Sequence, residues 1–473
     1  MFDKIHEECG VFGIFDKNKC DAVKSVYFGL YALQHRGQES CGIAVCNDGV
    51  FAHKKEDGLV SEVFNREELE RLGKGNIAVG HVRYSTTGGK NHNNIQPLVI
   101  RHVKGNLALV HNGNLVNASA IRSEFELSGA IFHGTSDTEA IAYSIVRERL
   151  SSTSTEQAIE RAMTHIKGAY SCIVMTATKM IAFRDPDGFR PLCIGKTPDG
   201  AYVIASETCA LDSVGAVFVR DVRPGEIVVV SDNGLKSIDT HCTEKNNICI
   251  FEYIYFARPD SVIEGKSVHR ARINAGKILA ERFPVSADVV IGVPDSGLDA
   301  GLGYSQASGI PYGTGFIKNK YIGRSFIQPS QNQRESAVRI KLNAISETVR
   351  NKRVIMIDDS IVRGTTCARI VGLLRDAGAK EVHVRISSPP FIHSCYFGTD
   401  IDSEENLIAC RYDTDGIRDY IGADSLAFLP AEELSGLIGG NHFCRGCFTG
   451  DYPVDVSGAG GKNKFDTPIH NNA

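Results

Sequence analysis

The chain has 473 residues, of which 14 are cysteines and none is tryptophan, and its 52 basic and 56 acidic side chains give a net charge of −4. At roughly 100–200 residues per domain, this length predicts two or three domains, each able to form a hydrophobic core without disulfides. Charged residues make up 23% of the chain, which argues against a disordered protein and against a polybasic binder, so no nucleic-acid partner is expected.

The cysteine count is the unusual part of this composition. Residues 1–8 contain no apolar core of a signal peptide, and no run of about 18 apolar residues occurs anywhere, so we expect no membrane partner. The expected location is therefore a reducing cytoplasm. In that compartment, cysteines are catalytic, metal-binding or inert core residues.

Residues 9–240 combine short predicted strands with a few helices. Val23, Val26 and Leu30 keep the spacing of a helix, which we expect to stop at Gly37, and residues 136–139 match a capping box that opens a second helix. The predicted strands are brief apolar runs at 42–45, 76–80, 107–110 and 226–230. This pattern predicts an α+β domain in which helices sandwich the sheets.

Cys9 stands just before a glycine-punctuated predicted strand. A lone cysteine in such a place is most often a small core residue. Three later segments change that weighting, namely GHVRYSTTG at 80–88, HNGNL at 111–115 and GTSDTE at 134–139. Together with Cys9 they resemble the class II, N-terminal-nucleophile (Ntn) glutamine amidotransferases, over residues 9 to about 235.

This resemblance implies that residues 1–8 are a propeptide, because mature members of the family begin with the nucleophilic cysteine. The catalytic residues would be Cys9, with the Asn112 side chain and the Gly113 N–H as its oxyanion hole. The implied glutamine-binding residues are Arg83, Asp137 and Arg36. From the residues alone, two alternatives stay open: Arg83 could form a surface ion pair, and Asp137 could serve to stabilise the dipole of the predicted helix.

A polar stretch at 232–247 separates this half from a second predicted domain at 248–455. The runs 289–293 and 354–357 are continuously apolar, as in parallel strands buried on both faces. After 354–357 come a loop, a helical pattern and the alternating strand 382–386, which together form a βαβ unit. We therefore expect an open α/β sheet with its ligand site beyond the carboxyl ends of the strands.

The most specific segment is 354–366, where an apolar strand ends in Asp358 and Asp359 and a small-residue turn leads into a helix. The turn's N–H groups and the helix dipole suit a phosphate, and the paired carboxylates suit ribose hydroxyls or Mg²⁺. The alternative is an acid pair that merely caps the helix. The segment resembles the phosphoribosyl-pyrophosphate (PRPP) signature of type I phosphoribosyltransferases, which implies PRPP binding by Asp358, Asp359, Ser360, Arg363, Gly364, Thr365 and Thr366.

Two further segments match that family. The turn with Asp295, Ser296 and Gly297 stands where the family has its pyrophosphate loop, and Ser296 would share Mg²⁺ with Asp358 and Asp359; alone, the turn would read as a plain β-turn. Lys318, Tyr321 and Arg324 lie in the polar stretch 315–334, which matches the family's mobile catalytic loop. From composition alone this stretch could be a solvated surface loop.

Cys444 and Cys447 form a Cys-x-x-Cys pair that could serve zinc, an iron–sulfur cluster or a redox dithiol. The contexts of Cys249 and Cys395 resemble the cluster-bearing branch of the glutamine PRPP amidotransferases. That resemblance implies a [4Fe–4S] cluster on Cys249, Cys395, Cys444 and Cys447. Spacing alone would not favour Cys249 over Cys242.

Both halves thus resemble one family, the amidophosphoribosyltransferases, over nearly the whole chain. The resemblance implies an enzyme that uses ammonia from glutamine to convert PRPP to 5-phosphoribosylamine, in a homo-oligomer (tetramer or dimer) inhibited by purine nucleotides. Two rivals are weaker. Another class II amidotransferase would lack the 354–366 segment, and a PRPP-sensing regulator would need a basic DNA-binding segment that we do not find. Residues 456–473 are Gly- and Asn-rich and predict a flexible tail.

Overall fold

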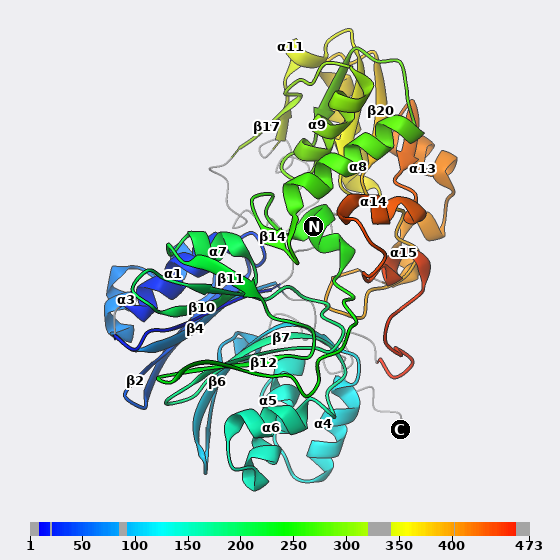
Figure 1. Ribbon diagram of the computed structural model, residues 1–473. Coiled ribbons are helices and arrows are strands. Elements are labelled where there is room, and N and C mark those ends of the chain that lie inside the picture. Colours follow the sequence, from blue (N-terminus) through cyan, green and yellow to red (C-terminus); the bar gives the residue numbers. More distant parts are fainter. Residues whose placement is uncertain (1–8, 19–20, 85–91, 320–341, 402, 460–473) are drawn as a thin grey trace, which may run out of the picture.

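The computed structural model describes residues 9–18, 21–84, 92–319, 342–401 and 403–459 (Figure 1). Tyr321, Arg324, the predicted propeptide and most of the predicted tail lie outside these residues. Within the described residues, no helix is both long and apolar enough to cross a membrane.

Two antiparallel sheets form the N-terminal half, and their strands occur in a different order from the sequence. The seven-stranded sheet contains, in spatial order, β11 (Val217–Asp221), β9 (Cys193–Lys196), β10 (Tyr202–Ala205), β1 (Gly10–Phe15), β4 (Ile77–Arg83), β2 (Ser40–Asn47) and β3 (Val50–Asp57). The six-stranded sheet contains β13 (Gly234–Ile238), β12 (Ile227–Ser231), β8 (Met180–Arg184), β7 (Gly168–Met175), β6 (Gly105–Leu115) and β5 (Leu98–His102).

The two sheets pack face to face, and helices cover their outer faces (Figure 1). Val11 and Val79 of the first sheet share one apolar cluster with Val110 and Ile173 of the second. The first sheet is covered by α1 (Ala22–Ala32), α2 (Val60–Val63), α3 (Arg66–Leu72) and α7 (Thr208–Asp212). The second sheet is covered by α4 (Ala118–Leu127), α5 (Asp137–Ser151) and α6 (Thr155–Ala162). This arrangement confirms the predicted Ntn-type α+β sandwich.

Two local predictions need correction. Helix α1 ends at Ala32, not at Gly37, and a Cβ on Gly37 would lie 2.6 Å from the backbone N of Arg83, so the glycine serves a close approach to β4. Ser136 caps α5 as predicted, by accepting from the Thr138 N–H at 3.2 Å. The Glu139 carboxylate, however, accepts from the N–H groups of residues 133 and 134 rather than completing the capping box.

The predicted polar stretch 232–247 is partly ordered in the sheet. Residues Gly234–Ile238 form β13, which pairs with β12. Leu235 packs between the two sheets, and Ile238 packs on the outer face of the second sheet, so this segment alternates across a sheet despite its polar composition. The connection between the halves therefore starts after Ile238.

A four-stranded parallel sheet forms the centre of the C-terminal half. Its strands, in spatial order, are β16 (Val289–Gly292), β19 (Arg353–Asp358), β20 (Glu381–Ile386) and β21 (Ser425–Phe428). Helices α8 (Val268–Arg282) and α9 (Gly297–Ser308) cover one face, and α12 (Thr365–Asp376) and α13 (Thr414–Ile421) cover the other. The β19–α12–β20 unit confirms the predicted βαβ unit and parallel sheet.

Shorter elements surround this sheet, and several of them lie at the junction with the N-terminal half (Figure 1). They are the π-helical turn η2 (Glu252–Phe256), β14 (Val262–Ile263), β15 (Lys266–Ser267), β17 (Phe316–Lys318), β18 (Leu342–Ala344), α11 (Ser346–Val349), α14 (Ser435–Ile438) and α15 (Gly446–Thr449). The 3₁₀ turns are η1 (His92–Asn94) in the first half and η3 (Glu404–Asn406), η4 (Ile408–Cys410) and η5 (Ala431–Leu434) in the second.

The two halves are joined by a buried interface. The rings of Phe189 and Phe397 stack with their centroids 4.1 Å apart, and the Arg190 guanidinium donates to the Phe397 carbonyl at 2.6 Å. Asn114 donates from Nδ2 to the Tyr396 carbonyl at 2.8 Å. These contacts bring the end of β6 next to the segment that follows residue 390.

Candidate active sites

Cys9 lies immediately before β1, a central strand of the seven-stranded sheet. The β1–β4 register pairs Gly10 with Val82, so Cys9 and Arg83 are neighbours at the same end of the sheet. The Cys9 thiol is partly exposed and donates to the Tyr84 carbonyl at 3.7 Å. The structure thus places the predicted nucleophile beside the predicted glutamine ligand Arg83, and the roles of both stay predictions.

Asn112 lies on β6, in the facing sheet. Burial lowers the pKa of His81 to about 3, and Nε2 of this neutral imidazole lies 3.0 Å from the His111 carbonyl, which ties β4 to β6 at this end. The Asn112 side chain is 1% exposed, and its Nδ2 has no hydrogen-bond partner within the described structure. Because a buried donor without a partner is costly, it suggests a role in binding an oxygen that the protein itself does not supply.

Gly113 follows on the same strand and has a backbone that only glycine tolerates. Its φ is +142°, and a Cβ at this position would lie 2.1 Å from the Ala169 carbonyl oxygen on β7. The close β6–β7 pairing therefore depends on the missing side chain.

The two predicted ligands of glutamine, Arg83 and Asp137, are both buried and lie on different layers. Arg83 ends β4 and is 5% exposed. Asp137 is the first residue of α5, and its Oδ2 accepts from the Leu115 N–H at 2.9 Å, while Oδ1 lies 3.6 Å from His111 Nδ1. Asp137 is thus fixed to β6, the strand of Asn112, and its contact with glutamine stays a prediction.

Arg36 lies deeper than a direct ligand of a substrate would be expected to lie. Its side chain is fully buried, and Nε donates to the Cys9 carbonyl at 3.1 Å. The two terminal nitrogens bind Glu207 at 2.6 Å and Glu252 at 2.7 Å. These contacts support a role in holding the Cys9 backbone, and contact of Arg36 with glutamine stays a prediction.

The partners of Arg36 could not be predicted from the motifs in the sequence. Glu207 and Glu252 are buried, as is Arg190, whose NH1 lies 3.4 Å from Glu252 Oε1. Glu252 is the one acid in the otherwise apolar and aromatic segment 248–256. A charge in such a segment is rarely buried without a partner, and this signal could have found it.

The predicted PRPP residues converge at the carboxyl ends of β16 and β19. These strands are parallel neighbours, with Gly292 opposite Ile357, so the turn at 294–297 lies beside Asp358 and Asp359. Both aspartates are 1% exposed. Asp359 accepts from the hydroxyls of Ser296 and Ser360, the latter at 2.5 Å. The structure therefore brings the two predicted loops into one cluster of oxygen atoms.

The turn that follows Asp359 leads into α12 as the sequence predicts. Gly364 precedes the helix with φ +87°, and Thr365 and Thr366 form its first turn. Backbone N–H groups at the start of a 12-residue helix, next to a glycine without a side chain, form a favourable environment for a phosphate.

Lys318 ends β17, the strand that leads into residues outside the description. Its Nζ lies 2.5 Å from Asp295 Oδ2 of the predicted pyrophosphate loop. Both side chains are about half exposed or more, so this ion pair contributes little to stability. The pair nevertheless places a cation beside the predicted pyrophosphate loop.

The four predicted cluster ligands also come together. Cys249 and Cys444 form an isolated parallel β-bridge. Burial is the main cause that raises the pKa of Cys447, and the nearby thiols of Cys395, Cys249 and Cys444 raise it further. Burial likewise raises the pKa of Cys444 to about 12. Cys242 instead lies near Arg223 and Asp239.

The spacing of the four sulfurs bears on which metal group they could hold. Among the described residues, no three of these four sulfurs form a group with all atoms within 4.8 Å of one another. Tetrahedral zinc, at about 2.3 Å from each sulfur, requires sulfurs closer than that. Four cysteine ligands are found in both zinc and iron–sulfur sites, and the assignment of a [4Fe–4S] cluster stays a prediction.

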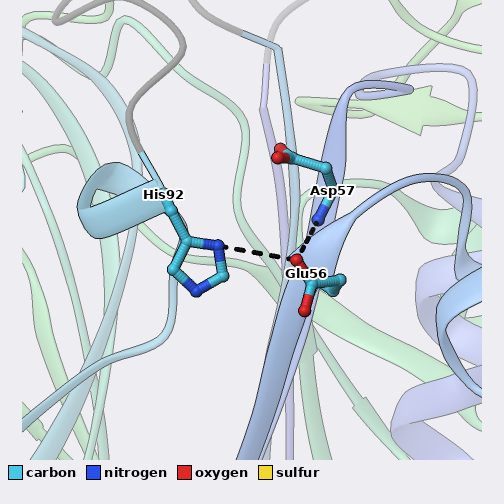
Figure 2. A group of neighbouring side chains, drawn as sticks. All are labelled: Glu56, Asp57 and His92. Carbon is cyan, nitrogen blue, oxygen red and sulfur yellow. Dashed lines mark hydrogen bonds and ion pairs between the residues drawn. The ribbon is translucent and has the colours of Figure 1, made fainter.

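One group of possible metal ligands lies elsewhere, at the end of the β2–β3 hairpin. Figure 2 shows Glu56, Asp57 and His92, whose ligand atoms lie within 4.8 Å of one another. All three are exposed, and His92 Nδ1 lies 3.6 Å from Glu56 Oε1. Exposed carboxylates commonly gather in this way without binding an ion.

A cavity of about 250 Å³ lies beside the N-terminus of α5. Its walls include Lys55, Gln96, Thr138 and Glu139. Gln96 accepts from the His111 N–H at 2.6 Å, directly before Asn112 in the chain. The cavity therefore lies at the same end of the sandwich as Asn112 and Asp137.

Comparisons with known proteins agree with this division. Residues 81–213 match the family model of the glutamine amidotransferase domain, and residues 264–387 match that of the phosphoribosyl transferase domain. Both matched ranges lie inside the corresponding halves of the structure.

Relatives match along nearly the full length of the chain. The amidophosphoribosyltransferase of Bacillus subtilis is 50% identical over 461 residues, 96% of this chain and 95% of the relative. That of Archaeoglobus fulgidus is 48% identical over 454 residues, 95% of this chain and 99% of the relative. A solved structure of the glutamine PRPP amidotransferase from B. subtilis, complexed with ADP and GMP, matches with a TM-score of 0.88 and 49% identity, and the match covers 95% of this chain and 98% of that one.

Proposed function

The chain belongs to the amidophosphoribosyltransferase family, and from this premise we propose how its residues divide the reaction. It is an enzyme of purine biosynthesis that uses glutamine and PRPP. The N-terminal half releases ammonia from glutamine, and the C-terminal half transfers it to the ribose of PRPP. The products are glutamate, 5-phosphoribosylamine and pyrophosphate.

In the first half, Cys9 is the nucleophile. Removal of residues 1–8 would free its α-amine, whose pKa near 8 allows it to take the thiol proton. The thiolate attacks the side-chain amide carbon of glutamine and expels ammonia, and water then hydrolyses the thioester to glutamate. The single observation that carries this assignment is the buried Nδ2 of Asn112, which lacks a partner in the described structure and is available to stabilise the oxyanion together with the Gly113 N–H.

Arg83 and Asp137 are the proposed ligands of the glutamine main-chain groups. A guanidinium can bind the α-carboxylate through two parallel bonds, and a carboxylate can accept from the α-ammonium. Both side chains are already buried and held, which reduces the entropy lost when glutamine binds.

In the second half, Asp358 and Asp359 bind the ribose hydroxyls, and residues 360–366 bind the 5′-phosphate. Ser296, Asp358 and Asp359 would hold Mg²⁺, because their clustered oxygens are the hard donors that this ion prefers. When bound, Mg²⁺ supplies positive charge to the pyrophosphate leaving group. Lys318 would add a second cation beside residues 295–297. Tyr321 and Arg324 belong to the same stretch as Lys318, residues 315–334, and their role in binding PRPP is proposed from the sequence alone.

Cys249, Cys395, Cys444 and Cys447 would hold a [4Fe–4S] cluster. These cysteines stand in three segments, at residues 249, 395 and 444–447, so the cluster would join distant parts of the chain rather than transfer electrons. The deeply buried thiols fit such a group, since an uncompensated thiolate in this environment is strongly disfavoured.

Regulation and assembly are proposed from the relatives. The B. subtilis protein was solved with ADP and GMP, which supports inhibition of this enzyme by purine nucleotides. We further propose that the protein is a homo-oligomer, either a tetramer or a dimer. We also propose a reducing cytoplasmic location, which the high cysteine content supports.

The test compares pyrophosphate release from PRPP with glutamine and with ammonium as the nitrogen source. We expect Cys9→Ala to abolish the glutamine-dependent rate and to keep the ammonium-dependent rate. Retention of the glutamine-dependent rate would contradict the nucleophile, and loss of both rates would contradict the two-site mechanism. Mass spectrometry of the active protein should find a chain that begins at Cys9.

A further inference from the structure

Four charged side chains form a buried group where the two halves meet, here termed the junction cluster. Its members are Arg36, Arg190, Glu207 and Glu252, each at most 1% exposed. The two guanidiniums and two carboxylates balance in charge. At this degree of burial each charge depends on its partners for compensation, so such a group keeps a strict geometry.

The junction cluster reaches the nucleophile through one bond. Arg36 Nε donates to the Cys9 carbonyl at 3.1 Å, and this carbonyl is bonded to the Cα that carries the CH₂–SH side chain. The Glu252 carboxylate accepts two hydrogen bonds from the same planar guanidinium, from NH1 to Oε2 at 2.9 Å and from NH2 to Oε1 at 2.7 Å. Because a guanidinium is rigid, this fork determines where the Nε–H points.

Glu207 completes the hold on Arg36 from the N-terminal half. It accepts from Arg36 NH1 at 2.6 Å and from the Ser261 hydroxyl at 2.7 Å. Burial by itself would raise the pKa of the Glu207 carboxyl. The nearby His35 and Arg36 outweigh this effect and keep the pKa well below its usual range, so Glu207 remains an anion.

Glu252 comes from the other half of the protein. It begins η2, and Arg272 of α8 donates to the Tyr253 carbonyl in this turn at 3.0 Å and to the Ala257 carbonyl just after it at 2.7 Å. Helix α8 packs against the parallel sheet, so Glu252 is positioned by the core of the phosphoribosyltransferase half. The glutaminase half thus has its nucleophile's backbone oriented by a residue from outside its own fold.

We propose that Glu252 is a positioning residue for glutamine hydrolysis, which acts through Arg36 to hold the Cys9 backbone in the geometry for attack. The inference rests on the proposed function in that it takes Cys9 as the nucleophile. Glu252 is fully buried and paired with Arg36 and Arg190, so we expect its loss to affect how the bound substrate is attacked and not how tightly it binds. A misplacement of about 1 Å at a reacting centre can reduce the rate about 10²-fold.

The experiment replaces the carboxylate with its neutral isostere. In Glu252→Gln we expect kcat with glutamine to fall about 10²-fold, KM for glutamine to stay unchanged, and the ammonium-dependent rate to remain. The rate at which iodoacetamide alkylates the Cys9 thiol should change in parallel. The matched control is Glu264→Gln, which removes another ion pair across the same junction, to Arg184 at 2.5 Å, without a link to Cys9.

Each outcome decides the matter. Equal loss of both rates in Glu252→Gln, a selective rise in KM, or the same selective loss in Glu264→Gln would overturn the proposal. If Glu252→Gln does not fold, Arg36→Lys keeps the charge but loses the fork, and a fall in kcat with glutamine is again expected while the ammonium-dependent rate is kept. Failure of the proposed function itself would be distinguished by a Cys9→Ala variant that still uses glutamine.

Discussion

Asn112→Ala is the substitution whose effect the structure defines most closely. The Asn112 Nδ2 is buried with no partner in the described structure, so its removal leaves no protein group newly unpaired. Water has little access to take its place, since the side chain is 1% exposed. Loss of one oxyanion donor in such a site costs about 2.7–4 kcal/mol, which corresponds to a fall of about 10²–10³ in kcat for glutamine hydrolysis.

The assay is steady-state glutamate release, with denaturant unfolding of the same samples. We expect kcat to fall with KM nearly constant, because the oxyanion exists only after attack, and we expect the stability to stay close to that of the unchanged protein. Asn114→Ala is the matched control on the same strand. Its amide donates to the Tyr396 carbonyl, so this variant should lose about 0.5–1.5 kcal/mol of stability while the chemical step is kept.

The reasoning would be refuted by an Asn112→Ala variant that hydrolyses glutamine at an undiminished rate. It would also be refuted by a large loss of stability without a selective loss of kcat. Either result would mean that the buried amide serves the fold and not the reaction.

Gly113→Ala should destabilise the protein by several kcal/mol, because its Cβ would meet the Ala169 carbonyl at 2.1 Å, and an unchanged denaturant midpoint would contradict this close pairing. Cys444→Ser should lose bound iron and sulfide, measured by elemental and colorimetric analysis, whereas Cys242→Ser should keep both; equal iron in the two variants would remove Cys444 from the ligand set. Burial, followed by the charge of Glu264, raises the pKa of Asp221 to about 7, so the native state holds a proton that the unfolded state releases near pH 4. The stability that this bound proton gives the native state is fully present below about pH 4 and is lost as the pH rises towards 7. Urea midpoints across this range should therefore depend less on pH in Asp221→Asn than in the unchanged protein. The same dependence on pH in both proteins would count against the raised pKa of Asp221.

Much of the fold could be read from local sequence because it depends on neighbours in the chain. The apolar run before Asp358 and the turn that ends at Gly364 specify a strand, a loop and a helix start within about a dozen residues, and the structure confirms each element. The same applies to Ser136, whose side chain caps α5 through a bond to a residue two positions away.

Other predictions failed where a distant segment decides the outcome. Gly37 has the local appearance of a helix stop, yet its lack of a side chain serves the approach to Arg83 on β4. Residues 234–238 lie inside the predicted range 9–240 of the first domain, but their polar composition gives no local sign that they pair with β12 as β13. Backbone pairing and close approach depend on partners that a local pattern does not contain.

The sequence by itself determined the two chemistries of this protein, because the residues that carry each one stand in short motifs whose spacing follows from a strand, a turn or a helix end. Only the tertiary structure decided how the two halves meet. Arg36 pairs with Glu207 and Glu252 across 171 and 216 residues of chain, and nothing in the sequence around any of them shows the others. Such pairs form because burial removes water from each charge and leaves a distant opposite charge as its main compensation.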